Sequence, residues 1–320
     1  MLTAMNYVAR GVQVVAELGL ADAVGEEPVS ITTLAAETQT RPDELGRVLR
    51  LLAAYEVFTV AGDAVAHTPM SRLLRSDHPS SLRAFARMIG LSVNWRATEH
   101  LGHALRTGEA GMRVALPEGV WAHYADHPDD ARIFDASMTS RASLMVPAIA
   151  SAYDFSAYPA LADIGGGRGH LLNAVLATTT TTRGILFDLP HVVAASREAG
   201  LHPRITGQPG DFFKDALPEA DAYILMEILH DWPDEQADQI VAAVGRAARP
   251  GSRLLIMEII PGATPGPAWA KTLDIVMLAH FGGKQRTVQE YRALLERNRF
   301  ALHRQIDTPA GISILEAVAV

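Results

Sequence analysis

The chain has 320 residues, of which 48% are hydrophobic, and a formal net charge of −8 at pH 7. This length suits about two domains with substantial cores. The negative balance argues against a nucleic-acid or anionic-membrane surface unless the charge is segregated. No run approaches roughly 18 uncharged apolar residues, so no membrane span is expected. Cysteine is absent, which excludes disulfides and thiolate chemistry. The absence of cysteine, together with an N-terminal sequence unlike a secretory signal, favours a cytoplasmic protein.

Apolar periodicity and turn residues predict a mostly helical segment over residues 1–95. The predicted elements are helices over 4–18, 34–38 (capped by Thr32 or Thr33) and 43–55 (with Pro42 in its first turn), then a hairpin of 57–60 and 64–67. Short helices followed by a hairpin are typical of a winged helix, a pattern that often binds DNA. Residues 1–95 carry eight Arg and ten Asp or Glu, a net charge of −2, whereas a DNA-reading module should be basic. We therefore expect a winged-helix-like dimerisation domain, with a ligand-responsive DNA-binding regulator as the less favoured alternative.

The remaining chain, 96–320, is predicted to hold a helical linker followed by an α/β domain. Helices are expected over 96–150 with a break at 108–119, and an antiparallel hairpin of 301–306 and 312–318 is expected at the end. Between them, short apolar strands alternate with helical stretches; the strands are 161–164, 184–187, 223–229 and 253–260. This alternation predicts a Rossmann-like, doubly wound parallel sheet.

The segment Leu161-Ala-Asp-Ile-Gly-Gly-Gly-Arg-Gly169 predicts a tight strand-to-helix turn that brings backbone close to a nucleotide. A dinucleotide fingerprint has glycine at its first, third and sixth positions. Counted from Gly165, the third position is Gly167, but the sixth is His170. The turn is therefore predicted to admit S-adenosylmethionine instead of a dinucleotide. Asp163, near the end of the strand, would accept a hydrogen bond from an ammonium group or a water.

Two further acidic residues end or follow the next strands along the chain, the second of which is a short strand before Gly210. Asp188, beside Leu189 in Phe187-Asp-Leu-Pro, can accept hydrogen bonds from both ribose hydroxyls. In Gly210-Asp-Phe-Phe, Asp211 would bind the adenine amine and Phe212 would pack on its ring. A single Asp at a strand end is usually a solvated cap. Three at the carboxyl edge of one sheet predict a cofactor site.

The predicted base is His230, which follows the strand and begins His-Asp-Trp-Pro. A histidine pKa near 6.5 suits proton acceptance at neutral pH. Glu258 lies near the end of the next predicted strand, 253–260, where a carboxylate in an apolar run needs a partner such as the ring of His230. Asp231 is a further catalytic candidate. The alternatives are that Asp231 caps the next helix and that Glu258 lies at an exposed sheet edge.

With these motifs in order, the chain resembles the S-adenosylmethionine-dependent O-methyltransferases of the plant caffeate and hydroxyindole type, particularly their bacterial natural-product relatives. The resemblance also covers Leu34-Ala-Ala-Glu, Leu49-Arg-Leu-Leu, Met257-Glu, Leu273-Asp-Ile-Val-Met-Leu and Gly282-Gly-Lys-Gln-Arg-Thr. It implies that His230 is the general base held by Glu258, and that no metal takes part. It also implies a homodimer. The implied site residues are Gly165, Asp188, Asp211 and Phe212 for the cofactor, and Met138, Asp274 and Met277 for the acceptor pocket.

Two positions depart from the family pattern. Gln285 stands where the family often has Glu, and it would stabilise an imidazolium less than a carboxylate does. Met226 stands at the position of a frequent cofactor-contacting Lys, whose aliphatic stem a packing contact could replace. The predicted reaction is methylation of a hydroxyl on a small aromatic or polyketide-like natural product. The alternative is a non-methylating reaction on the same fold, such as decarboxylation, hydroxylation or a pericyclic step.

Overall fold

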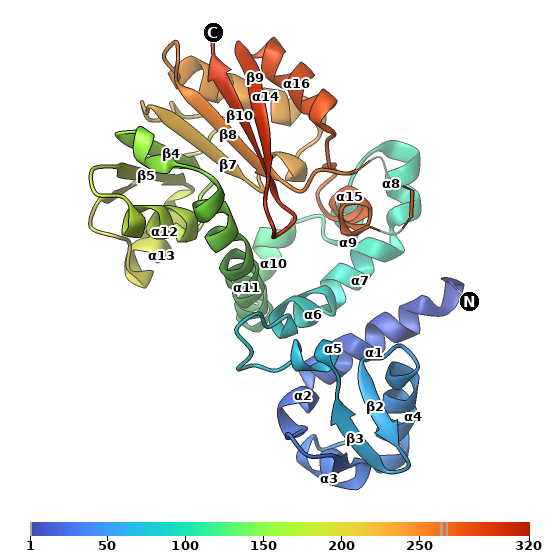
Figure 1. Cartoon of the computed structure of the whole chain (residues 1–320). Coiled ribbons are helices and arrows are strands. Elements are labelled where there is room, and N and C mark those ends of the chain that lie inside the picture. The colour runs from blue at the N-terminus through green and yellow to red at the C-terminus, as the bar shows by residue number, and fades with distance from the viewer. Residues whose placement is uncertain (1, 263–264, 267) are drawn as a thin grey trace. The chain divides into compact units, whose positions relative to one another are not determined.

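The computed structural model describes residues 2–262, 265–266 and 268–320, and the chain divides into two compact units (Figure 1). One unit comprises Met1–Arg96 and Leu116–Ser143, and the other comprises Ala97–Ala115 and Leu144–Val320. The helical segment 116–143 therefore clusters with the N-terminal unit, although it follows residue 96 in the sequence.

The N-terminal elements include the predicted helices and hairpin. They are η1 (Leu2–Ala4), α1 (Met5–Glu17), α2 (Leu20–Ala23), β1 (Val29–Ser30), α3 (Ile31–Glu37), α4 (Pro42–Ala53), β2 (Phe58–Ala61), β3 (Ala64–His67), α5 (Pro69–Arg72), α6 (Arg83–Ile89) and α7 (Ser92–Glu99). The strands form a small antiparallel sheet in the order β1-β3-β2. The predicted cap of α3 was wrong. The helix begins at Ile31, so Thr32 and Thr33 lie inside its first turn, and Ser30 accepts the capping bond from the Thr33 N–H.

The middle of the chain is helical, as predicted. Its helices are α8 (Leu101–Thr107), α9 (Gly111–Ala115), α10 (Val120–Asp126) and α11 (Pro128–Ala152). The expected break at 108–119 contains the short helix α9.

The C-terminal part contains a seven-stranded sheet in the order β6-β5-β4-β7-β8-β10-β9. The parallel strands are β4 (Ala160–Ile164), β5 (Arg183–Asp188), β6 (Ile205–Pro209), β7 (Ala222–Met226) and β8 (Arg253–Glu258). The antiparallel strands β9 (Phe300–Asp307) and β10 (Ser313–Ala319) complete it, as predicted. The strand order reverses beside β4, and in such sheets ligands bind at the carboxyl edge of the reversal point.

Helices cover this sheet and bury its central strands. They are α12 (His170–Thr178), α13 (Pro190–Ala199), α14 (Asp234–Ala247) and α16 (Val288–Arg297). The helix α15 (Trp269–His280) instead contacts α8 and α9, and the 3-10 turns are η2 (Phe155–Ala157) and η3 (Leu229–Asp231). A large core cluster joins apolar residues of β4, β7, β8 and β10 to those of α14 and α16. Burial on both faces explains why these strands are nearly continuous apolar runs instead of alternating ones.

Two predicted strands are shorter than expected: β8 ends at Glu258 instead of residue 260, and β7 ends earlier still relative to its prediction. β7 ends at Met226, Glu227 has a φ of +52°, and His230 lies in the turn η3 instead of directly at the end of the strand. The apolar run continues past the strand because Ile228 packs beside the glycine turn and Leu229 is fully buried. Hydrophobicity therefore extended the prediction beyond the residues that pair with neighbouring strands.

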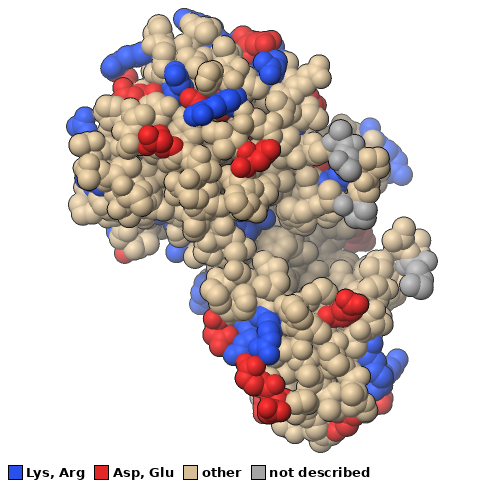
Figure 2. Space-filling model, in the orientation of Figure 1, with Lys and Arg blue, Asp and Glu red and all other residues tan. Residues whose placement is uncertain are grey.

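Among the residues that the structure describes, none of the helices has the length and apolar character needed to cross a membrane. On the face shown in Figure 2, basic side chains are scattered among acidic ones and form no broad basic surface.

Candidate active site

The glycine turn between β4 and α12 has the backbone conformation that its sequence predicts. Gly165, Gly167 and Gly169 have φ values of +73°, +58° and +73°, a region that favours glycine. The Gly165 N–H also donates to the carbonyl oxygen of Phe187 on β5, at 2.7 Å. A Cβ on Gly165 would lie 2.7 Å from Cδ1 of Ile228, so a side chain there would have to displace this neighbour.

Asp163 is buried at the carboxyl end of β4 and lacks part of its hydrogen bonding. Its Oδ1 is fully buried and has no hydrogen-bond partner. Burial, with a smaller contribution from Asp188, raises the pKa of Asp163 from its ordinary value of 3.8 to about 7. A cationic donor beside Oδ1 would supply the missing bond and favour the ionised form. This acceptor therefore fits the ammonium group of the predicted cofactor.

Asp188, at the end of β5, is held in place by backbone groups. Its Oδ2 accepts from the Gly167 N–H at 2.9 Å, and its Oδ1 accepts from the Leu189 N–H at 2.7 Å. Burial raises the pKa of Asp188, and these two bonds oppose the shift. A carboxylate has about four acceptor sites, so each oxygen keeps a lone pair for another donor. This arrangement can accept both hydroxyls of a ribose.

The other predicted cofactor residues lie at the same edge in more varied environments. Phe212 is near the glycine turn, with Cε1 3.8 Å from where a Gly165 Cβ would lie. Met226 is half-buried at the end of β7, and Leu189 is exposed at the start of α13. Asp211 already has local partners: its Oδ1 accepts from the Phe213 N–H, and its Oδ2 lies 2.9 Å from Nζ of Lys214.

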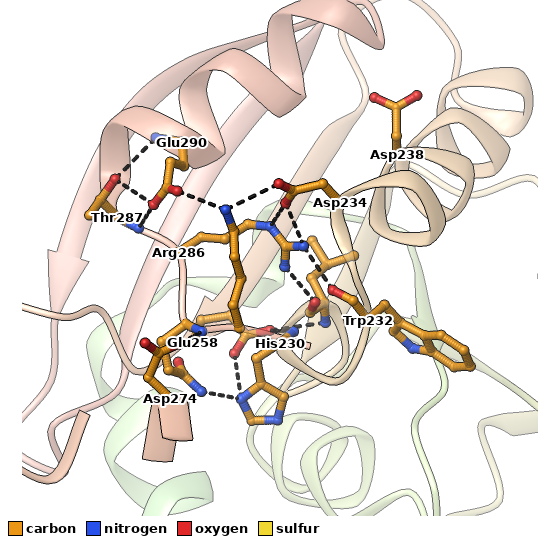
Figure 3. A network of polar contacts seen from close by, with 12 residues as sticks. His230, Trp232, Asp234, Asp238, Glu258, Asp274, Arg286, Thr287 and Glu290 are labelled. Atoms are coloured by element: carbon orange, nitrogen blue, oxygen red, sulfur yellow. Dashed lines mark hydrogen bonds and ion pairs between the residues drawn. The ribbon is translucent and has the colours of Figure 1, made fainter. Parts of the chain in front are cut away.

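The ring of His230 is held by Glu258 from the neighbouring strand β8 (Figure 3). Oε2 of Glu258 is 3.2 Å from Nδ1 of the ring, while Oε1 accepts from the N–H groups of Leu229 and His230 at 3.0 and 3.2 Å. One carboxylate thus fixes both the turn η3 and the imidazole that the turn carries. Glu258 is completely buried, in contrast to the alternative of an exposed sheet edge.

Two more carboxylates influence this pair. Burial raises the pKa of Glu258 well above its ordinary value, and the nearby charges of Glu227 and Asp231 raise it further. Oδ1 of Asp231 lies 3.4 Å from Nε2 of His230. Asp231 therefore faces the ring, and the cap of α14 falls at Pro233 without a side-chain hydrogen bond.

The segment between α15 and α16 completes the surroundings of the ring. Nε2 of Gln285 is 2.8 Å from Nδ1 of His230, and the Gln285 N–H donates to Oδ1 of Asp274 at 2.8 Å. Gly283 packs directly on the backbone of the turn η3, because a Cβ there would overlap the carbonyl oxygen of His230. This close approach explains the need for glycine at position 283.

Arg286 is a positioning residue that the sequence reasoning missed. It is 1% exposed, and its guanidinium donates to the carbonyl oxygens of Leu229 and Trp232 at 2.6 and 2.8 Å. Its Nε also donates to Oδ1 of Asp234 at 3.0 Å. The planar fork thereby fastens both sides of the turn that carries His230 (Figure 3). Arg286 follows Lys284 in a polar motif, so the sequence gives no direct signal that its side chain is buried. The apolar residues beside its partners, Leu229 and Trp232, are a weak indication of that burial.

The three predicted acceptor residues lie on two helices. Met138 is on α11, in the unit with the N-terminal elements, whereas Asp274 and Met277 are on α15. Met277 is buried, and Asp274 is engaged by the Gln285 backbone. Within the part of the chain that the structure describes, His, Asp and Glu form no group of three that could hold a metal ion.

Comparison with known families yields two matches that together span most of the chain. A family profile described as an O-methyltransferase domain matches residues 98–301, and one described as an O-methyltransferase dimerisation domain matches residues 4–77. The chain is 37% identical to a phenazine O-methyltransferase of Lysobacter antibioticus, over 97% of this chain and 92% of that protein. It is 36% identical to a mitomycin biosynthesis 6-O-methyltransferase of Streptomyces lavendulae, over 95% of this chain and 89% of that protein.

Solved structures of O-methyltransferases also align with the chain over its whole length. A mitomycin 7-O-methyltransferase aligns with a TM-score of 0.90 and 35% identity, over 100% of this chain and 96% of that one. An O-methyltransferase from neocarzinostatin biosynthesis aligns with a TM-score of 0.84 and 30% identity, over 100% of this chain and 98% of that one. The latter was solved with S-adenosylmethionine and 2-hydroxy-5-methyl naphthoic acid.

Proposed function

The chain belongs to the S-adenosylmethionine-dependent O-methyltransferases with an N-terminal dimerisation domain, and we propose that it methylates a hydroxyl on an aromatic natural product with His230 as the general base. The observation that carries this proposal is the contact between Glu258 and Nδ1 of His230 at the carboxyl edge of the sheet. A carboxylate at Nδ1 leaves Nε2 as the ring nitrogen that can receive a proton.

S-adenosylmethionine, when bound, supplies a methyl group on a positively charged sulfur, which makes that group reactive toward oxygen. The residues of this chain hold the cofactor and remove a proton. Asp163 offers an unpaired acceptor to the ammonium group, and Asp188 offers its remaining lone pairs to the ribose hydroxyls. Nε2 of His230 then takes the proton of the acceptor hydroxyl, which makes the oxygen a better nucleophile. Glu258 stabilises the imidazolium that results.

The names of the relatives support an aromatic acceptor. They include a phenazine O-methyltransferase and an enzyme solved with a hydroxylated naphthoic acid. We place the acceptor beside α15, where Asp274 and Met277 lie, and the resemblance to the family adds Met138. We also propose that the chain is a homodimer, since its first 95 residues contain the matched dimerisation domain. They also expose two large apolar side chains, Leu2 in η1 and Tyr7 on α1.

The test is an activity screen of the full chain with S-adenosylmethionine and a panel of hydroxylated phenazines and naphthoates. Product is read as the mass gain of one methyl group in place of hydrogen, and S-adenosylhomocysteine is measured in parallel. Stoichiometric formation of both separates methyl transfer from a non-methylating reaction. His230→Ala should lower turnover by about 10²–10⁴-fold, the usual contribution of a general base.

The matched control is His303→Ala, because His303 is exposed on the outer strand β9. This variant should keep the activity of the original chain. Cofactor binding to His230→Ala, measured by calorimetry, should also be retained. Methylation by His230→Ala at the original rate would show that another group removes the proton.

A further inference from the structure

Tyr291 on α16 carries a hydroxyl group into the apolar core. Its side chain is fully buried, and it belongs to the core cluster that also contains Leu229 and Ile256. Within the described part of the chain, its hydroxyl oxygen has no hydrogen-bond partner. A buried tyrosine hydroxyl usually has a partner, because leaving it unbonded costs free energy.

Glu258 has room for one more donor. Its Oε1 accepts from the N–H groups of Leu229 and His230, while its Oε2 faces Nδ1 of the ring. Oε2 is enclosed, and by hydrogen-bond geometry it has no partner among the described residues. A carboxylate oxygen has two acceptor sites, so Oε2 can serve both the ring and one further donor.

The side chain of Glu258 lies on the face of the sheet that contributes to the cluster of Tyr291. Leu254 and Ile256 of β8 belong to this cluster, whereas Leu255 between them does not. Because side chains alternate along a strand, Glu258 is on the same face as Leu254 and Ile256.

Two charges act on the hydroxyl from this side. Burial raises the pKa of Tyr291 well above its ordinary value, the charge of Glu258 raises it further, and Arg286 lowers it. The hydroxyl therefore lies near an anion that can accept its hydrogen and a cation that can donate to its oxygen.

Arg286 keeps a donor for that oxygen. Its Nε and Nη2 contact Asp234, Nη2 also donates to Trp232, and Nη1 donates to Leu229. Arginine has five N–H groups, so these contacts leave one N–H of Nη1 for Tyr291.

We propose that Tyr291 is a positioning residue whose hydroxyl accepts a hydrogen bond from Arg286 and donates one to Oε2 of Glu258. This bond keeps the carboxylate ionised beside the ring of His230, where it holds the Nδ1 proton and stabilises the imidazolium. The proposal deepens the assigned role of His230 and rests on it.

Other charged or titratable groups reach this site from the neighbouring elements. They are Glu227 after β7, His230 and Asp231 in η3, Asp274 on α15, Arg286 before α16 and Glu290 on α16. On the β10 side, the residue paired with Glu258 is the uncharged Ser313, which donates to Asp307. Because Glu258 and His230 are in contact, their titrations are coupled, and the experiment must observe Glu258 directly.

The experiment uses the full chain with glutamate labelled at the carboxyl carbon, studied by NMR without cofactor. The signal of Glu258 is the one missing from Glu258→Gln. Tyr291→Phe keeps the ring and removes only the hydroxyl. It should raise the titration midpoint of Glu258 by about one pH unit or more, because the ionised form loses a donor. An unchanged or lowered midpoint would overturn the proposal.

A second replacement should move the midpoint in the opposite direction. With 3-fluorotyrosine at position 291, the hydroxyl is a stronger donor on a ring of nearly the same shape, so the midpoint of Glu258 should fall. A rise would contradict the proposal, even if Tyr291→Phe failed to fold. In Tyr291→Phe, kcat should fall by roughly 10-fold, with the KM for S-adenosylmethionine unchanged.

The matched control is Tyr223→Phe. Tyr223 is also fully buried, on β7, but its hydroxyl donates to the carbonyl oxygen of Pro218. This variant should leave the midpoint of Glu258 unmoved. Failure of the inference is distinguishable from failure of the proposed function, because Glu258 is titrated without cofactor or acceptor, whereas the role of His230 is tested by the turnover of His230→Ala.

Discussion

The cofactor edge and the base site are neighbours in one sheet, yet they are assembled differently. At the proposed cofactor edge, Asp163, Gly167 and Asp188 come from a single β4–α12–β5 unit, and backbone N–H groups fix the carboxylate of Asp188. At the base site, His230 is held by Glu258 and Gln285, which lie 28 and 55 positions further along the chain. Contiguous sequence therefore builds the first region, and tertiary packing builds the second.

The two regions also use carboxylates in opposite ways. Asp163 keeps a buried oxygen without a partner, which suits a cation that arrives with the ligand. The carboxylate of Glu258 contacts the chain's own ring and two of its own N–H groups. The difference predicts that changes at the cofactor edge will alter ligand affinity, whereas changes around His230 will alter both stability and turnover.

The largest stability effect should come from Arg286→Ala. The change leaves the carbonyl oxygens of Leu229 and Trp232 without their donor and opens space beside the base turn. We expect a loss of about 3 kcal/mol in the free energy of unfolding, measured with urea, together with a fall in kcat.

The control for that variant is Arg297→Ala, whose exposed side chain pairs with Asp238. Such a surface pair should contribute less than about 1 kcal/mol. If both variants lost the same stability, the fastening of the base turn by Arg286 would not be the cause.

A second variant, Asp163→Asn, should separate affinity from stability. Affinity for S-adenosylhomocysteine, measured by calorimetry, should fall by roughly 10–100-fold, because a charge-assisted bond is lost. The free energy of unfolding of the cofactor-free chain should instead increase at pH 8. The pKa of Asp163 is raised from 3.8 to about 7, so the folded chain keeps a proton that the unfolded chain has released.

The sign of the pH dependence follows from that difference. In the original chain this residue makes the free energy of unfolding fall as the pH rises from about 4 to about 7, and the loss persists above that range. Asp163→Asn should lack this fall and should be the more stable protein at pH 8. The exposed Asp126→Asn serves as the control. A variant less stable than the original at pH 8 would show that the buried carboxyl is not a source of instability.

The smallest effect is expected from Asp211→Asn. Its carboxylate already accepts from the Phe213 N–H and pairs with the exposed Lys214. Affinity for S-adenosylhomocysteine should therefore change by less than about fivefold, the value of roughly 1 kcal/mol. A loss as large as that of Asp163→Asn would instead indicate a direct and strong contact with the adenine.

Most of the fold could be predicted from periodicity and turn residues. The alternation of apolar strands and helices identified the parallel sheet, and the closing hairpin was placed correctly. The errors came where local signals compete: Ser30, not Thr32 or Thr33, caps α3, and β7 stops at Met226 although the apolar run continues. In both cases hydrogen bonding, which composition does not reveal, sets the boundary.

The sequence by itself determined the glycine turn and the acidic residues at the carboxyl ends of β4 and β5, because positive φ angles and strand ends are local properties. It also indicated that His230 and Glu258 follow or end adjacent strands. Only the tertiary structure decided that Gln285 reaches the ring, that Gly283 packs against the turn and that Arg286 is buried beneath it. These contacts join segments that lie far apart in the chain, and long-range packing brings polar residues together without leaving a periodic signal in the sequence.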